Sequence, residues 1–499
     1  MKYVIGVDLG TSAVKILLVN MYGEIVQKVS KPLQIFQPKT GYSEQHPNEW
    51  VDQTIAGLSD LLDKFTGDPA DIEGISFSGQ MHGLVLLDKD QQVLRPAILW
   101  NDTRTTEECK EIYEKVGKER LLAITKNPAL EGFTLPKILW VKKHEPEIFT
   151  KVDKFVLPKD YVRFKLSGAL HMDYSDAAGT LLLDVSQKEW SNELCELLDI
   201  NIDICPPLVE STDETGKITS QYARLTGLPK STRIFAGGAD NACGAIGAGI
   251  LEKGKLLCSI GTSGVVAAYE TTGAKDFQEN IHYFNHSVPD AYYSMGVTLA
   301  AGYSLTWFKD TFAPEKKIDE LLSEVDSVPP GSNGLLFTPY LLGERTPHAD
   351  ATIRGSFIGI DSSHERKHFV RAVLEGITLS LNESIHIFRE QGKKVNSIIS
   401  IGGGAQNEQW LQIQADIFNA KIIKLSNEQG PGMGAAMLAA IGCNWFTSLQ
   451  ECAGKFLAVQ QTFIPNPDNV EQYEKLFSVY REIYGQTKRI NQALYNYRE

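Results

Sequence analysis

One short pattern occurs twice in this chain: an apolar strand, a tight loop of glycine and hydroxyl residues, and a second apolar strand. The first copy covers residues 4–19 with Gly-Thr-Ser in its loop, and the second covers residues 255–269 with Gly-Thr-Ser-Gly. Glycine allows the backbone N–H groups of such a loop to turn toward an anion, and the hydroxyl groups add further donors. One loop from each half could therefore hold a polyphosphate from both sides. The repetition predicts an internally duplicated α/β chain, with a sheet and helices in each half.

The composition limits the functions that remain. The 499 residues are 42% hydrophobic and 22% charged, as in an ordinary globular protein, and this length suits roughly two to four domains. A formal net charge of −13 argues against a general nucleic-acid or anionic-membrane binder. The seven cysteines contain no Cys-x-x-Cys pair. The chain reaches Asp8 too early for a signal peptide, and no apolar run approaches the roughly 20 residues that span a bilayer. We therefore expect a cytoplasmic protein in a reducing compartment.

Residues 235–249 consist almost entirely of glycine and alanine around a single carboxylate, Asp240. Small residues let backbone and ligand approach closely, and a lone acid in such surroundings is partly desolvated. Desolvation raises a carboxyl pKa toward values that suit proton abstraction, so we interpret Asp240 as a candidate catalytic base between the two halves. The alternative is a Gly/Ala-packed helix start that Asp240 caps, with Asn241 sharing that role.

The first hairpin also supplies a candidate metal ligand. Asp8 ends the first strand, just before Gly10, Thr11 and Ser12. A carboxylate at this position could hold Mg²⁺ through water, because Mg²⁺ keeps much of its hydration shell. The alternative is an ordinary hairpin in which Asp8 is a turn acid.

Two polar clusters next to apolar strands indicate a pocket for a polyol. The first, Gln-Met-His at residues 80–82, lies between two buried strands and suggests the edge of a pocket. A satisfied core histidine would give the same pattern. The second, Trp-Asn-Asp-Thr-Arg at residues 100–104, offers an aromatic wall and several hydrogen-bonding groups. Its Asn or Asp could instead cap the helix that follows.

Glycines at two further turns suit the approach of a nucleotide or close helix packing. One turn, residues 402–405, joins a strand to a helix, and the other, residues 430–434, begins a Gly/Ala-rich helix. A Walker-A loop is missing, so the hairpin loops would hold any nucleotide. Residues 364–368 match the His-Glu-x-x-His zinc-peptidase pattern. They fall in a polar first turn with no evident third ligand, which favours an accidental match.

Taken together, these residues resemble the FGGY family of carbohydrate kinases, part of the actin-like ATPase superfamily. The resemblance extends over essentially the whole chain and includes both family signature regions, at residues 132–144 and 355–375. The motifs at 79–83, 99–104 and 237–241 are similar to those of members that phosphorylate D-xylulose. Members that phosphorylate glycerol have Arg-Glu where this chain has Met-His. The implied fold is α/β, with two actin-like (ribonuclease H-like) domains, each a mixed sheet flanked by helices, and an active site in the cleft between them.

The resemblance also implies how the chain is divided. Residues 1–247 would form the N-terminal domain, with the sugar site, the first phosphate loop and the catalytic aspartate. Residues 248–499 would form the C-terminal domain, with the nucleotide site and C-terminal helices. The partners would be a small-molecule sugar and ATP, bound by a monomer or homodimer that contacts neither nucleic acid nor membrane.

The implied reaction is the ATP-dependent phosphorylation of D-xylulose to D-xylulose 5-phosphate and ADP, in xylose catabolism. Asp240 would take the proton from the 5-hydroxyl group, whose oxygen attacks the γ-phosphate of Mg-ATP in line. Asp8 would serve the Mg²⁺ and, with Asp240, form the catalytic pair. The implied sugar ligands are Met81, His82, Trp100, Asp240 and Asn241, and the implied ATP ligands are Gly10, Thr11, Gly261, Thr262, Ser263, Gly302, Gly403, Gly404 and Asn407.

Three other functions fit part of the sequence. A kinase for another ketose, polyol or sugar acid would share the same motifs. An actin- or chaperone-like ATPase would share the phosphate loops, but no β-rich peptide-binding domain follows the second half and the two polar clusters would have no use. A zinc peptidase would require the match at residues 364–368 to bind zinc.

Overall fold

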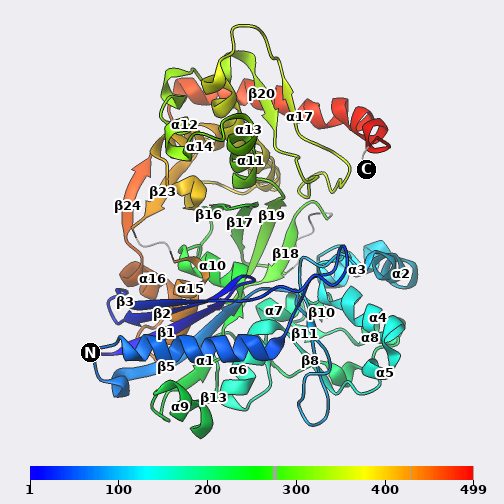
Figure 1. The fold of residues 1–499 in the computed structure, drawn as a ribbon, viewed down its shortest axis with the longest axis vertical. Coiled ribbons are helices and arrows are strands. Elements are labelled where there is room, and N and C mark those ends of the chain that lie inside the picture. Colours follow the sequence, from blue (N-terminus) through cyan, green and yellow to red (C-terminus); the bar gives the residue numbers. More distant parts are fainter. Residues whose placement is uncertain (274–276, 278, 427–428, 498–499) are drawn as a thin grey trace.

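The computed structural model describes residues 1–273, 277, 279–426 and 429–497. Two lobes face each other, and each is built on one large sheet (Figure 1). The first sheet has the strand order β13-β14-β5-β1-β2-β3, and β15 also pairs with β5. Its strands are β1 (Tyr3–Leu9), β2 (Ala13–Asn20), β3 (Ile25–Pro32), β5 (Ile72–Gly79), β13 (Glu214–Lys217), β14 (Arg233–Phe235) and β15 (Gly238–Ala239).

The second sheet has the order β18-β19-β17-β16-β22-β23-β24. Its strands are β16 (Lys255–Ile260), β17 (Gly264–Glu270), β18 (His282–Asn285), β19 (Tyr292–Thr298), β22 (Ser397–Gly402), β23 (Lys421–Leu425) and β24 (Val459–Phe463). The short strand pairs are β4 (Glu44–Gln45) with β7 (Ala97–Ile98), β6 (Val85–Leu87) with β8 (Lys154–Val156), β9 (Met172–Asp173) with β12 (Leu208–Val209), β10 (Leu183–Asp184) with β11 (Glu189–Trp190), and β20 (Leu336–Thr338) with β21 (Ser356–Ile358).

The two large sheets repeat one pattern of strand pairing, although the fifth and sixth strands follow opposite orders along the chain. The series β3-β2-β1-β5-β14-β13 corresponds to β19-β17-β16-β22-β23-β24. Each pairing has the same sense in both series: antiparallel for the first two, parallel for the next two, and antiparallel for the last. A long helix precedes the fourth strand in both, α1 (Pro47–Asp63) in the first and α13 (Arg366–Glu390) in the second. The duplication and the two-lobed α/β fold predicted from the repeated hairpin are confirmed.

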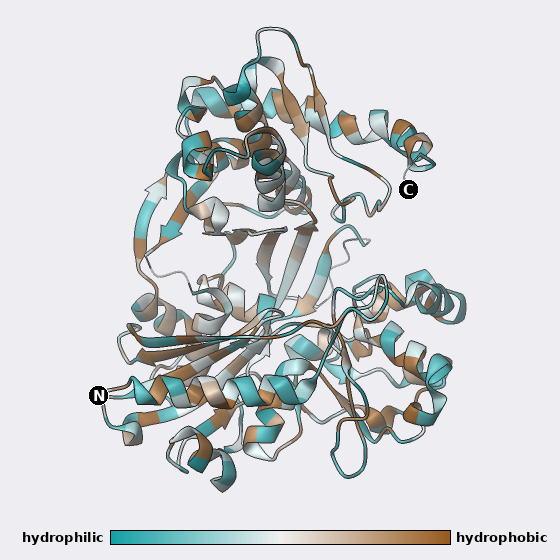
Figure 2. Ribbon diagram, viewed as in Figure 1, coloured by the Kyte–Doolittle hydropathy of each residue, from teal (hydrophilic) through white to brown (hydrophobic). Residues whose placement is uncertain are grey.

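Helices cover both faces of the first sheet. The helix α1 lies along β2 and β3, and its apolar side chains recur on one face, where Trp50, Leu58 and Leu61 are fully buried. The opposite face is covered by α10 (Asp240–Gly247) and α15 (Gly430–Gly442). Figure 2 shows the same pattern, with hydrophobic strands inside each lobe and hydrophilic residues along the outer side of α1.

The helices α10 and α15 lie unusually close because glycine lines their contact. A Cβ atom added at Gly434 would lie 1.9 Å from the carbonyl oxygen of Cys243. The contact between α15 and the first sheet is equally close, since a Cβ at Gly6 would lie 2.1 Å from the carbonyl oxygen of Gly432. Even a methyl group does not fit at these positions, so backbone packs directly on backbone. The Gly/Ala-rich start at residues 430–434 is therefore used for helix packing.

This packing takes part of the C-terminal half into the first lobe. The helices α15 and α16 (Leu449–Phe456) fall within residues 248–499, yet both belong to the apolar cluster that covers the first sheet. The strands before and after them, β23 and β24, belong to the second sheet. The chain thus crosses between the lobes here as well as at α10, which differs from a simple division at residue 247.

A mostly helical region lies beside the first sheet and contacts both lobes. It contains α2 (Thr106–Val116), α3 (Lys118–Thr125), α4 (Thr134–His144), α5 (Pro146–Phe149), α7 (Tyr174–Ala178) and α8 (Asn192–Leu197), while α6 (Pro158–Ser167) packs on the first sheet beside α1. Asn127 in this region donates from Nδ2 to the carbonyl oxygen of Tyr283 at 2.7 Å, and its Oδ1 lies 3.0 Å from Nδ1 of His282. Both partners lie on β18, so the second sheet is anchored to the first lobe at this edge.

The second lobe carries the remaining helices. They are α11 (Gly302–Phe312), α12 (Ile318–Leu322), α14 (Glu408–Phe418) and α17 (Pro467–Tyr495), while α9 (Ser220–Thr226) lies in the first lobe. The helix expected from about residue 469 is α17, which buries Tyr473 and Tyr480 against the second lobe. Over the described ranges, no helix combines the length and the apolar character needed to cross a membrane.

We predict that Gly434→Ala lowers the free energy of unfolding by about 1–3 kcal/mol, because the added methyl group overpacks the contact between α10 and α15. Gly485→Ala is the matched control: it lies within α17 with no atom within 4 Å of an added Cβ, so we expect a gain of about 0.5–1 kcal/mol from helix propensity. Urea denaturation of both variants measures the difference. Equal effects would contradict the packing argument.

Candidate active site

The two glycine and hydroxyl loops lie at matching positions in the two lobes. In the first, the Gly10 N–H donates to the Ala13 carbonyl oxygen at 3.0 Å, and in the second the Gly261 N–H donates to the Ser263 carbonyl oxygen at 3.0 Å. Each loop follows the central strand of its sheet, β1 or β16. The duplication of the sheets therefore extends to the two predicted phosphate loops.

Asp240 is the first residue of α10 and lies half-buried in the wall of a cavity between the lobes. Its Oδ1 accepts hydrogen bonds from the backbone N–H of Asn241 at 2.8 Å and from the Asn241 side-chain amide at 3.1 Å. Burial raises the pKa of Asp240 to about 7, and the nearby charge of Asp8 adds to the rise. Ala239 occupies the N-cap position, so capping by Asp240 is limited to one neighbouring N–H. A carboxyl with a pKa near 7 suits general base catalysis.

The cavity beside Asp240 has a volume of about 240 Å³ and is lined by all five predicted sugar ligands. Those are Met81, His82, Trp100, Asp240 and Asn241, and the other lining residues are Leu130, Gly132, Phe133, Ser263, Val265, Met295, Val297 and Arg345. Both lobes contribute to the wall. Its apolar surface with a few polar groups is typical of a site that orients a small ligand.

His82 is held as a neutral ring. Its Nδ1 lies 2.6 Å from the carbonyl oxygen of Gly179, so this nitrogen carries the proton. Burial lowers the pKa of His82 to about 3, and the ring packs against Phe133 with centroids 4.5 Å apart. The other nitrogen, Nε2, is then a hydrogen-bond acceptor in the cavity wall. One ring nitrogen is therefore satisfied within the protein, as a core histidine would be, while the role of the other as a sugar ligand stays a prediction.

Trp100 connects the sugar cavity to the first phosphate loop. Its Nε1 donates to Oγ1 of Thr11 at 2.9 Å, and that hydroxyl donates to Oε1 of Gln80 at 3.1 Å. Gln45 donates from Nε2 to the Thr11 carbonyl oxygen at 2.7 Å. The Thr11 hydroxyl therefore braces the loop, and its proton is not the free phosphate donor that the sequence predicts. Backbone N–H groups of the loop are the donors left for phosphate.

A second cavity, of about 360 Å³, lies next to the loop after β16 and contains most of the predicted ATP ligands. These are Gly261, Thr262, Gly302, Gly403, Gly404 and Asn407, and Ile260, Tyr303, Leu305, Thr306, Ile318, Asp319, Leu322, Gln406 and Trp410 complete its wall. Ser263 lines the sugar cavity instead, and Gly10 and Thr11 line neither. The two cavities thus meet the same loop from either side.

Glycine allows α11 to dock directly on this loop. The Gly302 N–H donates to the Gly261 carbonyl oxygen at 2.8 Å, and a Cβ at Gly302 would lie 2.4 Å from that oxygen. Asn407 caps α14 by accepting from the Trp410 N–H at 2.9 Å. Its predicted role in the nucleoside site is therefore combined with a structural one.

Asp8 is buried on the face of β1 that α15 covers, beside Gly432. Burial raises the pKa of Asp8 to about 6, and the neighbouring Lys15 and Ser78 side chains oppose the rise. Asp8 and Asp240 are close enough that the charge of one raises the pKa of the other. Two buried carboxylates close together favour the binding of a cation, and oxygen ligands of this kind fit Mg²⁺ with its bound water.

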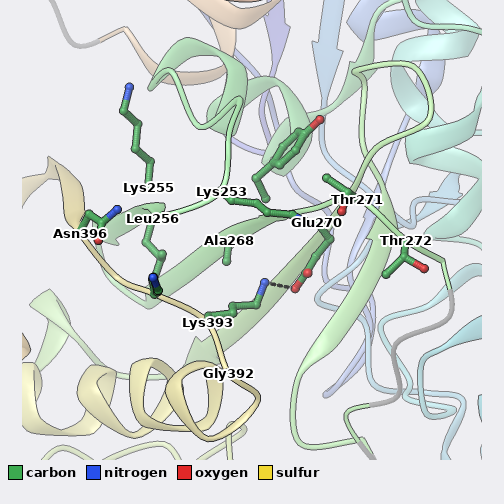
Figure 3. Close-up of a pocket in the computed structure, with 13 residues that line it drawn as sticks. Lys253, Lys255, Leu256, Ala268, Glu270, Thr271, Thr272, Gly392, Lys393 and Asn396 are labelled. Carbon is green, nitrogen blue, oxygen red and sulfur yellow. Dashed lines mark ion pairs between the residues drawn. The ribbon is translucent and has the colours of Figure 1, made fainter.

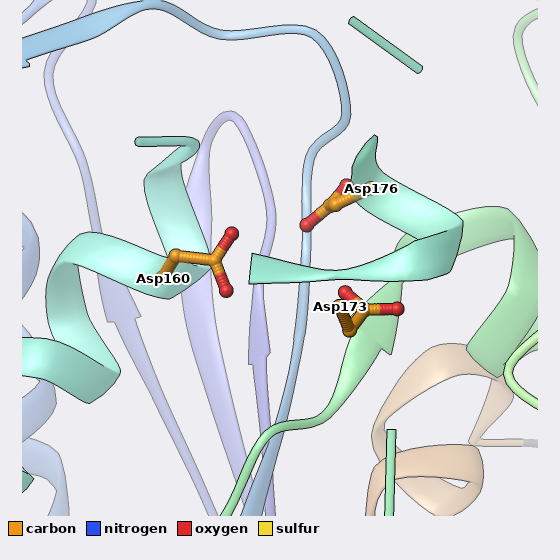
Figure 4. A group of neighbouring side chains, drawn as sticks. All are labelled: Asp160, Asp173 and Asp176. Carbon is orange, nitrogen blue, oxygen red and sulfur yellow. The ribbon is translucent and has the colours of Figure 1, made fainter. Parts of the chain in front are cut away.

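A buried cluster of charges lies behind Asp240. The carboxylates of Asp160, Asp173 and Asp176 converge on one point (Figure 4). The Lys159 ammonium already occupies it, 2.7 Å from Asp160, 2.7 Å from Asp173 and 2.9 Å from Asp176. Burial lowers the pKa of Lys159, but the three carboxylates raise it by more. A lysine nitrogen in this position replaces a metal ion, so the cluster is a structural ion network.

The same network holds the backbone next to Asp240, the candidate base. Ser175 donates from Oγ to Asp173, and that Oγ accepts the N–H of Ala239 at 2.9 Å. Because the Ser175 proton goes to Asp173, the hydroxyl of Ser287, 3.1 Å away, must donate to Ser175. Ser287 follows β18 of the second lobe. The hydrogen bonds of Ser175 therefore connect the buried charges, the backbone of Ala239 and Ser287 of the other lobe.

Most of the polar cluster at residues 100–104 faces away from the sugar cavity, which corrects the prediction of polyol binding by the whole cluster. Arg104 Nη2 lies 2.7 Å from Asp102 and 2.7 Å from Glu44. Its guanidinium carbon stacks 3.6 Å from the ring centroid of Tyr42. Arg104 is thus paired inside the protein and not with a ligand. Trp100 is the member of the cluster that lines the cavity.

The two histidines of the zinc-peptidase match are engaged with neighbouring groups. His368 accepts the Glu365 N–H on Nδ1 at 2.9 Å, and its Nε2 lies 3.2 Å from the Asn333 side-chain amide. His364 accepts the Asp361 N–H on Nδ1 at 3.0 Å, and its Nε2 lies 3.3 Å from the Asn333 carbonyl oxygen. All four ring nitrogens have partners, which argues against a zinc site.

Two cations near the sugar cavity were missed by the sequence analysis. Lys137 donates from Nζ to the carbonyl oxygens of His82 at 2.9 Å and Gly132 at 2.7 Å, and so holds two parts of the wall together. Arg345 lines the cavity directly. A signal existed for both: Lys137 lies in a family signature region, and Arg345 belongs to a charged Gly-Glu-Arg-Thr-Pro stretch.

A cavity of about 400 Å³ lies at the other end of β16 and is lined by Lys253, Lys255, Lys393 and Lys394 among others (Figure 3). In it, Lys393 forms an ion pair with Glu270. The strand β16 starts at Lys255 and ends at Ile260, beside the nucleotide cavity. This lysine-lined cavity is therefore separated from the cleft by the length of the strand and contains none of the predicted ligands.

The sequence also matches a known protein family over most of its length. The N-terminal domain of the FGGY family of carbohydrate kinases matches residues 3–247, and the C-terminal domain of that family matches residues 256–443. The chain therefore belongs to the FGGY family of carbohydrate kinases. It is a phosphotransferase with an alcohol group as acceptor, and its fold is actin-like.

Individual relatives are similar along the whole chain. A xylulose kinase from Bacillus subtilis (strain 168) is 60% identical over 499 residues, covering 100% of both chains. The crystal structure of a ligand-bound xylulose kinase from Lactobacillus acidophilus has a TM-score of 0.93 at 29% identity, covering 98% of this chain and 99% of that one. A gluconate kinase from the same organism has a TM-score of 0.92 at 29% identity, covering 97% and 98%.

The raised pKa of Asp240 predicts an acidic limb in the pH profile of kcat/KM with a midpoint near pH 7. Below that pH the carboxyl carries a proton and cannot accept another, so the rate should fall about tenfold per pH unit. Thermal unfolding measured over the same pH range separates this effect from loss of the fold. A midpoint between pH 4 and 5, the ordinary range of a carboxyl group, would contradict the assignment.

Proposed function

We propose that the protein transfers the γ-phosphoryl group of Mg-ATP to the 5-hydroxyl group of D-xylulose. The observation that carries the proposal is the position of Asp240, a half-buried acid in the wall of a sugar-sized cavity that Ser263 of the second phosphate loop also lines. The nucleotide cavity lies on the other side of that loop. A sugar hydroxyl in one cavity and a γ-phosphate from the other would meet at the loop.

In this mechanism, the protein mainly positions the reactants. Asp240 accepts the proton of the 5-hydroxyl group as its oxygen attacks, and the pKa near 7 makes the carboxylate available at neutral pH. Asn241 holds Oδ1 of the base by two hydrogen bonds, which orients the carboxylate. The neutral His82 and the walls from both lobes hold the sugar and exclude water, a competing acceptor.

Mg²⁺ is part of this proposal. Asp8, with its raised pKa and its position beside Asp240, would hold the ion through water. The ion would neutralise phosphate charge when bound. Backbone N–H groups of the loops at Gly10 and Gly261 would hold the phosphates, and the cavity at Gly302, Gly403 and Gly404 the nucleoside.

A kinase for a sugar acid is the second candidate within the family. A gluconate kinase is as similar in structure as a xylulose kinase, with TM-scores of 0.92 and 0.93. The 60% identity to a xylulose kinase over the full length supports the ketose. A protein-binding ATPase is disfavoured because a built sugar cavity adjoins the base.

The seven cysteines are all free thiols, which supports the cytoplasm as the compartment of this reaction. The domain division, with the sugar site in residues 1–247 and the nucleotide site in residues 248–499, stays part of the proposal. So does the expectation of a monomer or homodimer.

We predict that Asp240→Ala lowers kcat by at least about 10²–10⁴-fold, because the general base is lost. Nucleotide affinity should be almost unchanged, since Asp240 lies outside the nucleotide cavity. Steady-state kinetics gives the first quantity and ADP titration calorimetry the second. Near-normal turnover would remove Asp240 from the mechanism.

A substrate panel tests the choice of sugar. We expect the highest ATP-dependent rate with D-xylulose among D-xylulose, D-ribulose, L-ribulose, gluconate and glycerol, measured by coupled detection of ADP. Preference for gluconate would favour the sugar-acid kinase. ATP turnover that is independent of every sugar would favour the ATPase class.

A further inference from the structure

Arg345 brings a positive charge from the second lobe to the sugar cavity. It lines the cavity together with His82 and Asp240 of the first lobe, and its charge acts on both His82 and His282. Burial lowers the pKa of Arg345. Within the described part of the chain, no hydrogen bond or ion pair joins its guanidinium to another side chain. Arg345 is half-buried, so its guanidinium is partly removed from water and can be completed by the hydrogen bonds of a ligand.

The acids nearest to Arg345 are engaged elsewhere. The Glu344 carboxylate accepts the backbone N–H of Arg345 at 2.8 Å and that of Leu299 at 3.1 Å, and its other oxygen takes the Ser380 hydroxyl at 3.3 Å. Glu131 accepts from the Thr106 hydroxyl at 3.1 Å. Neither carboxylate is within ion-pair distance of the Arg345 guanidinium. The charge is therefore not neutralised by either acid and can act on a ligand in the cavity.

The backbone of Arg345 is held in place by β19. Thr346 donates from its N–H to the carbonyl oxygen of Val297 at 2.9 Å, and its hydroxyl accepts the Val297 N–H at 3.0 Å. Leu299, just after the strand, is bound by Glu344. Met295 and Val297 of the same strand line the cavity. The loop that carries Arg345 is therefore tied to β19 and the residue after it through both neighbours of the arginine, Glu344 and Thr346.

The polar groups of the cavity differ in what they can do. Asp240 and Nε2 of His82 accept hydrogen bonds, while Asn241 and Ser263 can both donate and accept. The Trp100 N–H is already used by Thr11. Arg345 is thus the donor-only group that the described lining leaves available.

D-Xylulose has one group that is acceptor-only, the ketone oxygen at C2, whereas each hydroxyl group also carries a proton to donate. Ring closure of this sugar consumes the 5-hydroxyl group, so a molecule that can be phosphorylated at O5 is in the open-chain form and has a free ketone. We propose that Arg345 donates to the C2 ketone oxygen of the open-chain sugar and so selects ketoses over the corresponding polyols. This inference rests on the proposed function and adds a specificity-determining residue to it.

The test compares D-xylulose with xylitol, which has a hydroxyl group in place of the ketone. In Arg345→Met, we expect kcat/KM for D-xylulose to fall about 10–100-fold, as for the loss of a hydrogen bond from a charged donor. The kcat/KM for xylitol should fall much less, so the preference for D-xylulose over xylitol should be largely lost. Arg345→Lys, which keeps a donor and the charge, should retain part of the ratio. Arg224→Met, at an exposed arginine of α9, is the control and should change neither value.

Several results would overturn the proposal. An equal fall for ketose and polyol would place Arg345 on the transferred phosphoryl group or in lobe closure, and no fall would remove it from the site. Thermal unfolding and the KM for ATP, unchanged in each variant, exclude a folding defect. If the wild-type protein uses another ketose, the proposed function fails, but the ratio between that ketose and its polyol still tests Arg345. If it prefers gluconate, both fail, and Arg345 binds a carboxylate.

Discussion

The backbone contact between α10 and α15 determines where the rest of the site lies. Glycine on both helices removes every atom that would separate them, and the added Cβ at Gly434 would overlap the Cys243 carbonyl oxygen at 1.9 Å. Because Asp240 begins α10 and Gly432 lies beside Asp8, this contact brings the base and the candidate metal ligand to one point. It also joins the lobes, since the strands flanking α15 and α16 belong to the second sheet.

Electrostatics then gives the site its chemistry. Burial raises the pKa of Asp8 and of Asp240, and the charge of Asp8 adds to the rise at Asp240. The excess negative charge is tolerable where a divalent cation and a proton donor are to bind. Behind it, Lys159 forms ion pairs with three buried carboxylates, and this network fixes the backbone at Ala239 through Ser175. The acids around Lys159 thus have a structural role, whereas Asp8 and Asp240 remain available to a metal ion and a substrate.

Specificity and water exclusion depend on the same geometry. The sugar cavity has walls from both lobes, with His82 and Asp240 from one and Arg345 from the other. Closure of the lobes would complete the set of hydrogen bonds to the sugar at the moment it excludes water from the phosphoryl group. A sugar that leaves Arg345 unpaired would oppose that closure.

The sequence by itself determined the duplicated α/β fold, because an apolar strand followed by a Gly-Thr-Ser loop is a local pattern that each half repeats. It also pointed to five of the residues that line the cavity beside Asp240 and to six that line the cavity beside Gly261. Only the tertiary structure decided which polar groups are left for a ligand. Arg104 is paired with Glu44, and Thr11 with Trp100, which are partners distant in sequence, whereas Arg345 has no such side-chain partner among the described residues. Whether a charge is paired depends on contacts between elements far apart in the chain, and no local pattern specifies those contacts. The crossing of α15 into the first lobe escaped the sequence analysis for the same reason.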